Sequence, residues 1–460
     1  MGETFDAIVI GAGQAGPSLA ARLAQAGRKV AIIERHLVGG TCVNTGCTPT
    51  KAMVASAYAA HLARRAGDYG VNIAGPIAID MAAVKARKDA IAGNSRRNNE
   101  TWLEGIDGVS LIRGHARFTG PHEIDVGGET LRAPQIFLNV GGRAVTPAMP
   151  GLDGIDYLTN SSLLDLEEIP KRLVVIGGSY IGLEFAQIFR RLGAEVTVVE
   201  MSPRIVARED EEVSAAVQSF LEEEGIRFRL SAECISFEKR DDGIAASVTC
   251  ASGEPAEIGS HVLLAVGRRP NTDDLGLDEA GVALDQRGYV VVDEELRTSV
   301  EGIWALGDCN GRGAFTHTAY NDFEIVAANL LDGDSRRLGD RFPVYALYTD
   351  PPLGRVGMTE AQARAEGVSY KVATRPMTRV GRAIEKGETK GFMKAVVDAR
   401  TDRILGAAVL GVGGDEAVHG LLYAMQGGVT ADAIRRTTPI HPTVAELFPT
   451  LMGSLRLAEG

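Results

Sequence analysis

Two cysteines, Cys42 and Cys47, lie five positions apart in the segment 39–51, which reads GGTCVNTGCTPTK. A structural disulfide rarely closes so short a loop, because a disulfide stabilises a protein more when it constrains a long one. Two ordinary core thiols are the alternative, since free cysteine is among the most often buried residue types. The glycines around the pair favour a dithiol that opens and closes, and therefore redox chemistry.

The chain before the cysteines has the pattern of a dinucleotide-binding βαβ unit. An apolar strand at 7–10 leads into the turn GAGQAG, a helical pattern follows, and a second strand ends at Glu34. In such a unit Gly11 permits the tight turn, Gly13 lets the backbone approach a pyrophosphate, and Gly16 lets helix and strand pack closely. The helix N-terminus favours phosphate charge, and Glu34 can accept hydrogen bonds from ribose hydroxyls.

The same unit recurs later in the chain. Gly177, Gly182 and Glu200 each follow their counterparts in the first unit by 166 residues. Ser179 stands where the middle glycine is expected. Because serine is small, we expect a slightly looser pyrophosphate contact and a retained site.

Two dinucleotide sites and a dithiol indicate an electron relay. One cofactor brings a hydride, the second accepts it, and the cysteines carry the electrons onward. A flavin suits the middle position, because it accepts hydride and can reduce a disulfide. Glu200 favours a free 2′-hydroxyl and therefore NADH, although Arg204 and Arg208 follow it closely.

Bulk composition excludes several other classes of protein. The 460 residues suggest about three domains. A net charge of −12 argues against nucleic-acid surfaces and anionic membranes. An odd count of five cysteines does not fit a secreted disulfide framework. No signal-like segment or bilayer-spanning apolar run is recognisable, so we expect a cytoplasmic protein without a membrane or nucleic-acid partner.

The remaining segments complete an α/β pattern and then depart from it. A strand at 261–266 ends at Gly267, and a strand at 303–306 ends at Gly307-Asp308, where open α/β sheets bind ligands. A helical pattern runs from Thr316 to Leu330, and its N-terminus suits negative charge on a reduced flavin. From about Phe342 onward, new strands and a helix near 416–427 predict a separate α+β domain.

With these motifs the sequence resembles the pyridine nucleotide-disulfide oxidoreductases, which include dihydrolipoamide dehydrogenase, glutathione reductase and mercuric reductase. The motifs fall in family order over essentially the whole chain. The resemblance implies an α/β fold with two Rossmann-like domains and a C-terminal α+β dimerisation domain. The implied FAD domain is split between 1–148 and 270–341, around an NAD(P)H domain at 149–269, and the dimerisation domain spans 342–460.

The resemblance also implies catalytic roles. Cys47 matches the thiol nearest the flavin, which forms the charge-transfer thiolate, and Cys42 matches the interchange thiol that attacks the substrate. His441 matches the base that the other subunit of a homodimer contributes, so the active site would be shared across the interface. Glu446 matches the carboxylate that orients this histidine.

The matching cofactor contacts divide into two sets. For FAD they are Gly11, Gly13, Gly16, Glu34, Thr41, Lys51, Ala116, Asp308 and Thr316; for NAD(P)H they are Gly177, Ser179, Tyr180, Gly182, Glu184, Glu200 and Gly267. Within these sets, Lys51 and Glu184 match an ion pair beside the flavin, and Tyr180 matches a gate over the nicotinamide. We assign no resident metal site.

The resemblance leaves the electron acceptor open. Pro439 replaces a second histidine that is usual in dihydrolipoamide dehydrogenases. The chain keeps His441 and has no cysteine pair at its C-terminus, unlike most mercuric reductases, yet the segment 40–51 looks closer to that branch than to glutathione reductase. We expect a small disulfide or dithiol substrate. Reduction of a soft ion such as Hg(II) is the alternative, and a flavoprotein subunit of a larger dehydrogenase complex is a third hypothesis.

One further departure concerns the end of a predicted strand. Asn139-Val140-Gly141 stands where the family shows Ala-Thr-Gly. The sequence alone assigns no effect to this change.

Overall fold

The first glycine turn emerges from a five-stranded parallel sheet. The structure is a computed structural model that describes residues 2–248 and 255–458. From edge to edge the sheet contains β18 (Ile303–Ala305), β8 (Gln135–Leu138), β2 (Ala7–Ile10), β3 (Val30–Glu34) and β4 (Val109–Arg113). All of β2 and the last three residues of β8 are buried and apolar, as in parallel sheets covered on both faces. Helix α1 (Gly16–Gln25) packs on this sheet and on α9 (Thr316–Ala327).

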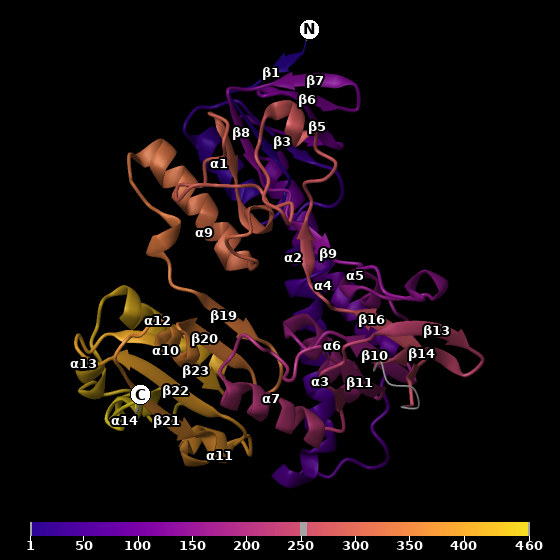
Figure 1. Cartoon of the computed structure of the whole chain (residues 1–460), viewed down its shortest axis with the longest axis vertical. Helices are drawn as coiled ribbons and strands as arrows, with labels where there is room; N and C mark the ends of the chain where they lie inside the picture. Colours follow the sequence, from indigo (N-terminus) through magenta and orange to yellow (C-terminus); the bar gives the residue numbers. More distant parts are fainter. Residues whose placement is uncertain (1, 249–254, 459–460) are drawn as a thin grey trace.

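The second glycine turn emerges from a four-stranded parallel sheet. Its order is β12 (Arg227–Arg229), β11 (Glu195–Val199), β10 (Arg172–Ile176) and β16 (His261–Leu264). Helices α6 (Tyr180–Leu192) and α7 (Glu211–Glu223) belong to this unit, and a small antiparallel sheet flanks it: β13 (Ser236–Arg240), β14 (Gly243–Ser247) and β15 (Glu257–Gly259). Figure 1 shows the first unit at the top and the second at the lower right.

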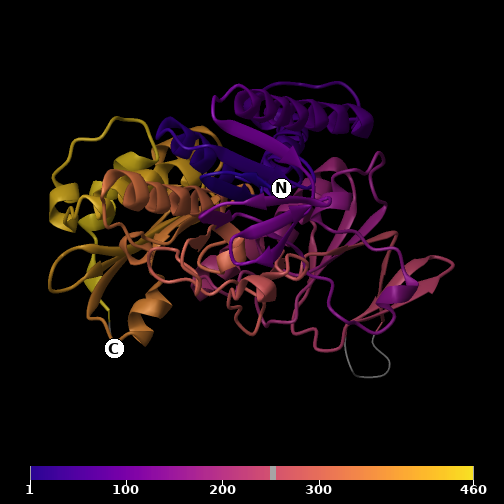
Figure 2. The same cartoon turned by 90° about the horizontal axis from the view of Figure 1, so that it is seen from above.

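The C-terminal region is built on a different sheet. Six antiparallel strands follow the order β19 (Val344–Leu347), β20 (Leu353–Gly357), β23 (Ile404–Leu410), β22 (Phe392–Asp398), β21 (Tyr370–Pro376) and β24 (Arg456–Leu457). Helices α10 (Glu360–Ala365), α12 (Gly414–Gln426) and α13 (Ala431–Arg435) pack around it. Figure 2, seen from above, shows this region at the left and the second unit at the right; both lie below the first unit in Figure 1. The predicted fold class, two Rossmann-like units and a C-terminal α+β region, is confirmed.

Two long helices connect the units. Helix α3 (Cys47–Arg64) packs against α4 (Met81–Glu104) and against α6 of the second unit. Helix α3 therefore carries the redox segment from the first unit toward the second. Among the residues described, no helix combines the length and the apolar character that a bilayer crossing requires.

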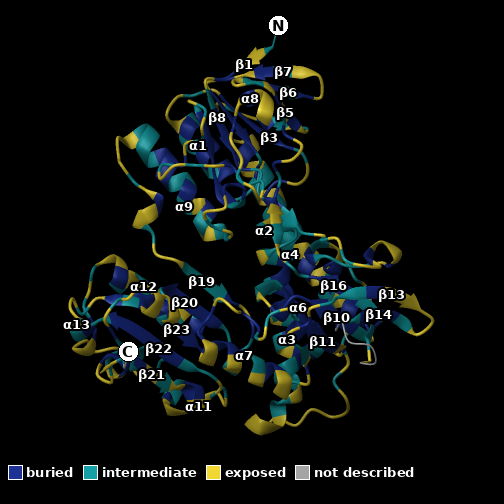
Figure 3. Ribbon diagram, viewed as in Figure 1, coloured by how far each residue is buried: buried dark blue, intermediate teal, exposed yellow. Residues whose placement is uncertain are grey.

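Shorter elements complete the chain. A small sheet of β1 (Glu3–Thr4), β7 (Glu129–Arg132), β6 (Glu123–Val126) and β5 (Ala116–Gly120) caps the first unit, and β9 (Gly142–Ala144) pairs with β17 (Arg268–Pro270). The short helices include α2 (Gly40–Asn44), α5 (Asn160–Leu163), α8 (Leu277–Ala280), α11 (Gly381–Glu385) and α14 (Phe448–Met452). Figure 3 shows that the central strands of the two parallel sheets and of the six-stranded sheet are buried and that exposure concentrates on helix faces and loops.

The predicted strand at 261–266 is two residues too long. The strand from 261 ends at Leu264, because the parallel pairing with β10 stops there. The helical run predicted from Thr316 through Leu330 is confirmed: α9 ends at Ala327 and continues directly as a π-helical turn at Ala328–Asp332.

Candidate active site between the two glycine turns

The two glycine turns have nearly the same geometry. Gly11 and Gly177 have φ angles of +103° and +114°, and each donates its N–H to the end of the next strand at 2.8 Å. A Cβ at Gly11 would lie 2.3 Å from the Asn139 carbonyl oxygen, and one at Gly177 would lie 2.4 Å from that of Ala265. No other residue type fits such a position without movement of the backbone, which supports the tight-turn role predicted for both glycines.

The acid that ends each unit braces its own turn. Glu34 accepts a hydrogen bond from the Ala12 N–H at 2.9 Å, and Glu200 accepts one from the Gly178 N–H at 2.7 Å. The backbone N–H two residues after each acid donates to the other carboxylate oxygen, at 2.7 and 2.8 Å. The turns therefore fix the orientation of both carboxylates. Ribose hydroxyls would donate hydrogen bonds to the same carboxylates.

One cavity of about 2130 Å³ contains both turns and both thiols. Most of the predicted site residues line it: Gly11, Gly13, Glu34, Thr41, Cys42, Cys47, Lys51, Ala116, Asp308, Thr316, Gly177, Ser179, Tyr180, Glu184, Glu200 and Gly267. At Gly13 a Cβ would meet only Asn139 atoms, at 3.4 Å or more, so the backbone faces open space where a pyrophosphate can approach. These residues fit two dinucleotides.

The third glycine of each turn serves packing. A Cβ at Gly16 would lie 2.2 Å from the Gly11 carbonyl oxygen, and one at Gly182 would lie 2.0 Å from that of Gly177. Neither glycine is among the described residues that line the cavity. Their contribution is the close approach of helix to turn.

The two cysteines occupy different local environments. Cys42 lies in α2, and Cys47 is the first residue of the 18-residue helix α3, where the helix dipole favours a thiolate. Both thiols are free, and Cys47 Sγ lies 3.3 Å from Thr316 Oγ1 at the start of α9. A hydrogen bond with Cys42, helped by Thr316 and Lys51, lowers the pKa of Cys47 to about 6 although burial opposes this. The same hydrogen bond and burial raise the pKa of Cys42.

An ion pair beside the thiols joins the three regions of the molecule. Lys51 Nζ lies 2.6 Å from Glu184 Oε2, and the Glu184 side chain is only 7% exposed. The Tyr348 N–H donates to the other Glu184 oxygen at 3.0 Å, and Lys51 Nζ lies 4.5 Å from the centre of the Tyr348 ring. Sequence reasoning missed Tyr348, because no motif surrounds it and its partners lie far away in the chain.

Asp308 is paired with an arginine that was not among the predicted site residues. Asp308 Oδ2 lies 3.7 Å from Arg268 Nε, and Arg268 Nη2 donates to Thr41 Oγ1 at 3.4 Å. Burial raises the pKa of Asp308, although the charge of Arg268 opposes the shift. The sequence contained a signal here, since Arg268 directly follows Gly267 at the end of a strand.

Asn139 supports the first turn. Its Nδ2 donates to the Gly11 carbonyl oxygen at 3.0 Å, and its side chain is buried. A Cβ at Gly16 would come within 2.8 Å of the same nitrogen. The departure from Ala-Thr-Gly thus places a hydrogen-bond donor at the centre of the first turn.

The predicted histidine and its orienting acid lie apart from the cavity. His441 Nδ1 lies 2.9 Å from Glu446 Oε2, and the His441 side chain is 78% exposed. Neither residue is among the described residues that line the cavity. Within one chain, therefore, the structure brings together the thiols and the two turns, and it leaves His441 facing outward.

Comparison with known proteins agrees with this arrangement. The family model for pyridine nucleotide-disulphide oxidoreductases matches residues 5–322, and the model for the dimerisation domain of that family matches residues 344–452. The chain is 38% identical to a dihydrolipoyl dehydrogenase of Thermus scotoductus, over 96% of each protein. It is 35% identical to a mercuric reductase of Streptomyces lividans, over 96% of this chain and 94% of that protein.

A solved structure of similar fold adds to these matches. The HOCl-induced flavoprotein disulfide reductase RclA from Escherichia coli superposes with a TM-score of 0.89 at 33% identity, covering 97% of this chain and 99% of that one. Family models and relatives alike extend over nearly the whole chain. The chain is therefore an enzyme of the pyridine nucleotide-disulfide oxidoreductase family and carries the dimerisation domain of that family.

Proposed function

We propose that the enzyme passes electrons from NADH through FAD to Cys42 and Cys47, and from these thiols to a small disulfide substrate. The observation that carries this proposal is the single cavity that holds both glycine turns and both thiols. The family uses FAD and NAD(P)H. FAD, when bound, supplies the two-electron link between nicotinamide and thiols. We place the enzyme in the cytoplasm because of its net charge of −12 and its odd cysteine count.

The thiols reduce the substrate in two exchange steps. The Cys42 thiolate attacks one substrate sulfur, and the other substrate sulfur leaves and takes up a proton. The Cys47 thiolate then attacks the Cys42 sulfur, which releases the first substrate sulfur and forms the Cys42–Cys47 disulfide. Two electrons pass from the two thiols to the substrate; one of the two protons that the products take up comes from Cys42, and the second comes from solvent.

The two pKa shifts make a base necessary. Cys47, with a pKa of about 6, is a thiolate at neutral pH, whereas the raised pKa of Cys42 keeps that thiol protonated. His441 of the partner subunit is the proposed base, in a homodimer whose active site is shared. Its exposure and its hydrogen bond with Glu446 support this role, because Glu446 fixes the ring and stabilises the imidazolium.

The choice of NADH rests on the second acid. Glu200 follows β11, and its carboxylate is fixed by two backbone N–H groups at the cavity wall. A fixed negative charge there favours a 2′-hydroxyl and repels a 2′-phosphate. Arg208 also lines the cavity, so we expect a preference for NADH of moderate size.

The test is anaerobic NADH oxidation by the purified enzyme, with lipoamide, oxidised glutathione and Hg(II) offered in parallel. We expect turnover with one disulfide and its loss in Cys42→Ser and in His441→Ala. Disulfide reduction that survives Cys42→Ser would contradict the proposal. Repeating the assay with NADPH measures the nucleotide preference, and Glu200→Ala is expected to reduce it.

Reduction of a soft metal ion is the second candidate. Relatives named mercuric reductase are 32–35% identical over 96% of this chain, and RclA from Escherichia coli has been solved as a Cu(II) complex. Two neighbouring thiols suit such ions. Turnover with Hg(II) alone, unaffected by His441→Ala, would favour this function.

A further inference from the structure

The hydroxyl of Tyr180 is anchored to a buried carboxylate. It donates to Glu209 Oε1 at 3.1 Å, and the Tyr345 hydroxyl donates to the same oxygen at 2.7 Å. The Tyr180 ring also meets the rings of Tyr345 and Phe315 edge-on, with centroids 5.6 and 6.5 Å apart. The ring that lines the cavity is therefore held at its hydroxyl end and packs against two aromatic rings, which stack on each other with centroids 5.7 Å apart.

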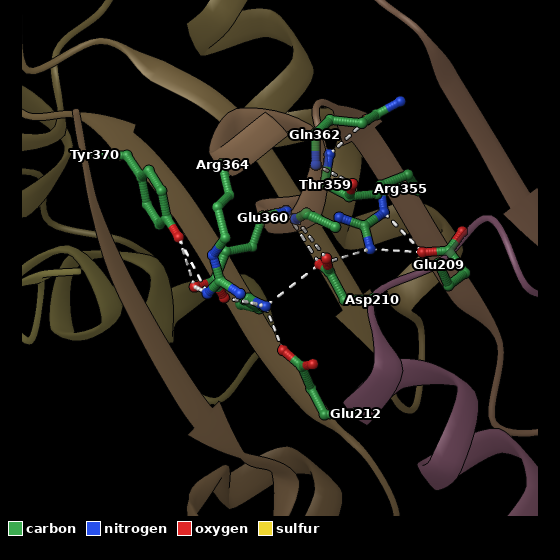
Figure 4. A network of polar contacts seen from close by, with 11 residues as sticks. Glu209, Asp210, Glu212, Arg355, Thr359, Glu360, Gln362, Arg364 and Tyr370 are labelled. Atoms are coloured by element: carbon green, nitrogen blue, oxygen red, sulfur yellow. Dashed lines mark hydrogen bonds and ion pairs between the residues drawn. The ribbon is translucent and has the colours of Figure 1, made fainter. Parts of the chain in front are cut away.

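The carboxylate is in turn held by the dimerisation domain. Arg355, on β20, is fully buried, and its Nε lies 3.0 Å from Glu209 Oε2. Figure 4 shows the Arg355 guanidinium lying between Glu209 and Asp210. Asp210 accepts hydrogen bonds from the Ala361 N–H at 3.1 Å and from Lys394 at 3.3 Å. This buried cluster fixes the segment before α7 against β20, α10 and β22.

The charged acceptor makes the anchor strong. Hydrogen bonds to an ionised carboxylate are roughly twice as strong as neutral ones, and low exposure strengthens them further. Burial and the neighbouring Glu209 charge raise the pKa of Tyr180, so its hydroxyl stays a donor at neutral pH. Movement of the ring away from the cavity breaks this hydrogen bond.

We propose that Glu209 is a positioning residue that holds the Tyr180 ring in the closed position, so that part of the binding free energy of the nicotinamide nucleotide is used to release it. The inference rests on the proposed function and on the family resemblance, which matches Tyr180 to a gate over the nicotinamide. Because Arg355 holds the other side of Glu209, nucleotide binding is coupled to the domain that carries His441. Such coupling is reciprocal between the two sites.

The first test compares two matched substitutions in the FAD-loaded enzyme. Tyr180→Phe removes the anchored hydroxyl and keeps the ring. Tyr345→Phe removes a hydroxyl from the same Glu209 oxygen but leaves the Tyr180 anchor in place. Titration calorimetry with NAD⁺ measures binding without turnover. We expect Tyr180→Phe to bind NAD⁺ at least about fivefold more tightly and Tyr345→Phe to stay within about twofold of wild type.

A second pair separates positioning from a purely structural role. Glu209→Gln keeps an acceptor oxygen but removes the charge, whereas Glu212→Gln alters a carboxylate of the same cluster that pairs with Lys394. We expect both to lower the melting temperature and only Glu209→Gln to tighten NAD⁺ binding. A fall in melting temperature with unchanged affinity in Glu209→Gln would mean that Glu209 is structural only, and would overturn the inference.

The outcomes distinguish the inference from the function on which it rests. If the wild-type holoenzyme binds neither NAD⁺ nor NADP⁺, both are overturned. If it binds NAD⁺ and Tyr180→Phe binds it equally or more weakly, the inference alone fails. Tighter binding in Tyr345→Phe as well as in Tyr180→Phe would attribute the effect to a relaxed carboxylate, and would also overturn it.

Discussion

The two dinucleotide units share a turn and differ in what surrounds it. At the first turn, Asn139 donates a side-chain hydrogen bond to the Gly11 carbonyl oxygen at 3.0 Å. The redox segment covers the same turn, since a Cβ at Gly40 would lie 2.8 Å from Gly13 Cα. At the second turn Ala265 takes the place of Asn139, and the middle residue, Ser179, is exposed.

This difference matches the proposed roles of the two cofactors. A turn that is braced by a side chain and covered by another segment suits a cofactor that stays bound. An open turn beside an anchored tyrosine suits a nucleotide that enters and leaves in every cycle. We infer that the two sites differ less in their backbone than in the side chains around it.

The largest expected effect comes from alanine at the first glycine of each turn. Gly11→Ala places a Cβ 2.3 Å from a carbonyl oxygen at a φ of +103°, and Gly177→Ala is strained in the same way. We expect at least about 3 kcal/mol lower unfolding free energy in each. Flavin absorbance should be lost only in Gly11→Ala, and NAD⁺ binding by calorimetry should be lost in Gly177→Ala with FAD retained. Loss of FAD in both variants would remove the distinction between the two sites.

Asn139→Ala tests the brace on the first turn. The Gly11 carbonyl loses its side-chain partner, which costs about 1–2 kcal/mol, or about tenfold in FAD dissociation constant. Fluorescence titration of the apoenzyme with FAD measures this. Asn329→Ala is the control, because Asn329 donates to a backbone carbonyl at 2.9 Å outside the cavity. Equal affinity in Asn139→Ala and wild type would show that the brace does not matter.

Lys51→Met breaks the ion pair that links the redox segment to the second unit. The positive charge of Lys51 favours the Cys47 thiolate, so its removal should raise the pKa of Cys47 above its value of about 6. Ultraviolet thiolate absorbance of the reduced enzyme, followed from pH 5 to 9, measures the shift: the thiolate should appear at higher pH than in wild type. Lys29→Met, at an exposed pair with Glu3, should leave the titration unchanged.

The smallest effect is expected at the open turn. Ser179→Gly restores the usual middle glycine of the second unit. Because Ser179 is exposed and its side chain makes no cap hydrogen bond to α6, NAD⁺ affinity should change by less than about threefold. Gly13→Ser, the reverse change in the covered turn, should weaken FAD binding more. Equal effects of the two substitutions would contradict the comparison.

Local patterns predicted the turns well. The constant spacing between the units identified both, and strand, glycine and acid follow one another within about 25 residues, so short-range constraints determine them. Short-range patterns do not identify Lys51 and Glu184 as partners, because the two residues are 133 positions apart. This pair was predicted from the family resemblance alone.

Contacts between distant segments were not predictable in this way. Tyr345 meets Glu209 across 136 positions and Asn139 meets Gly11 across 128. No periodicity or motif encodes such pairs, because they depend on how three sheets pack. The boundary that was wrong, at 261–266, depends on a strand-pairing partner in the same way.

The order of the strands in the first sheet has a consequence for biosynthesis. Strand β18 lies at the edge of that sheet next to β8, but it is made only after the whole second unit. Until residue 305 leaves the ribosome, β8 is an unpaired edge, and Asp308 and Thr316 are missing from the cavity. The second unit has all four of its strands by residue 264 and can fold first. The domain that begins the chain is thus finished after the second unit, and under the proposed function flavin loading must wait for it.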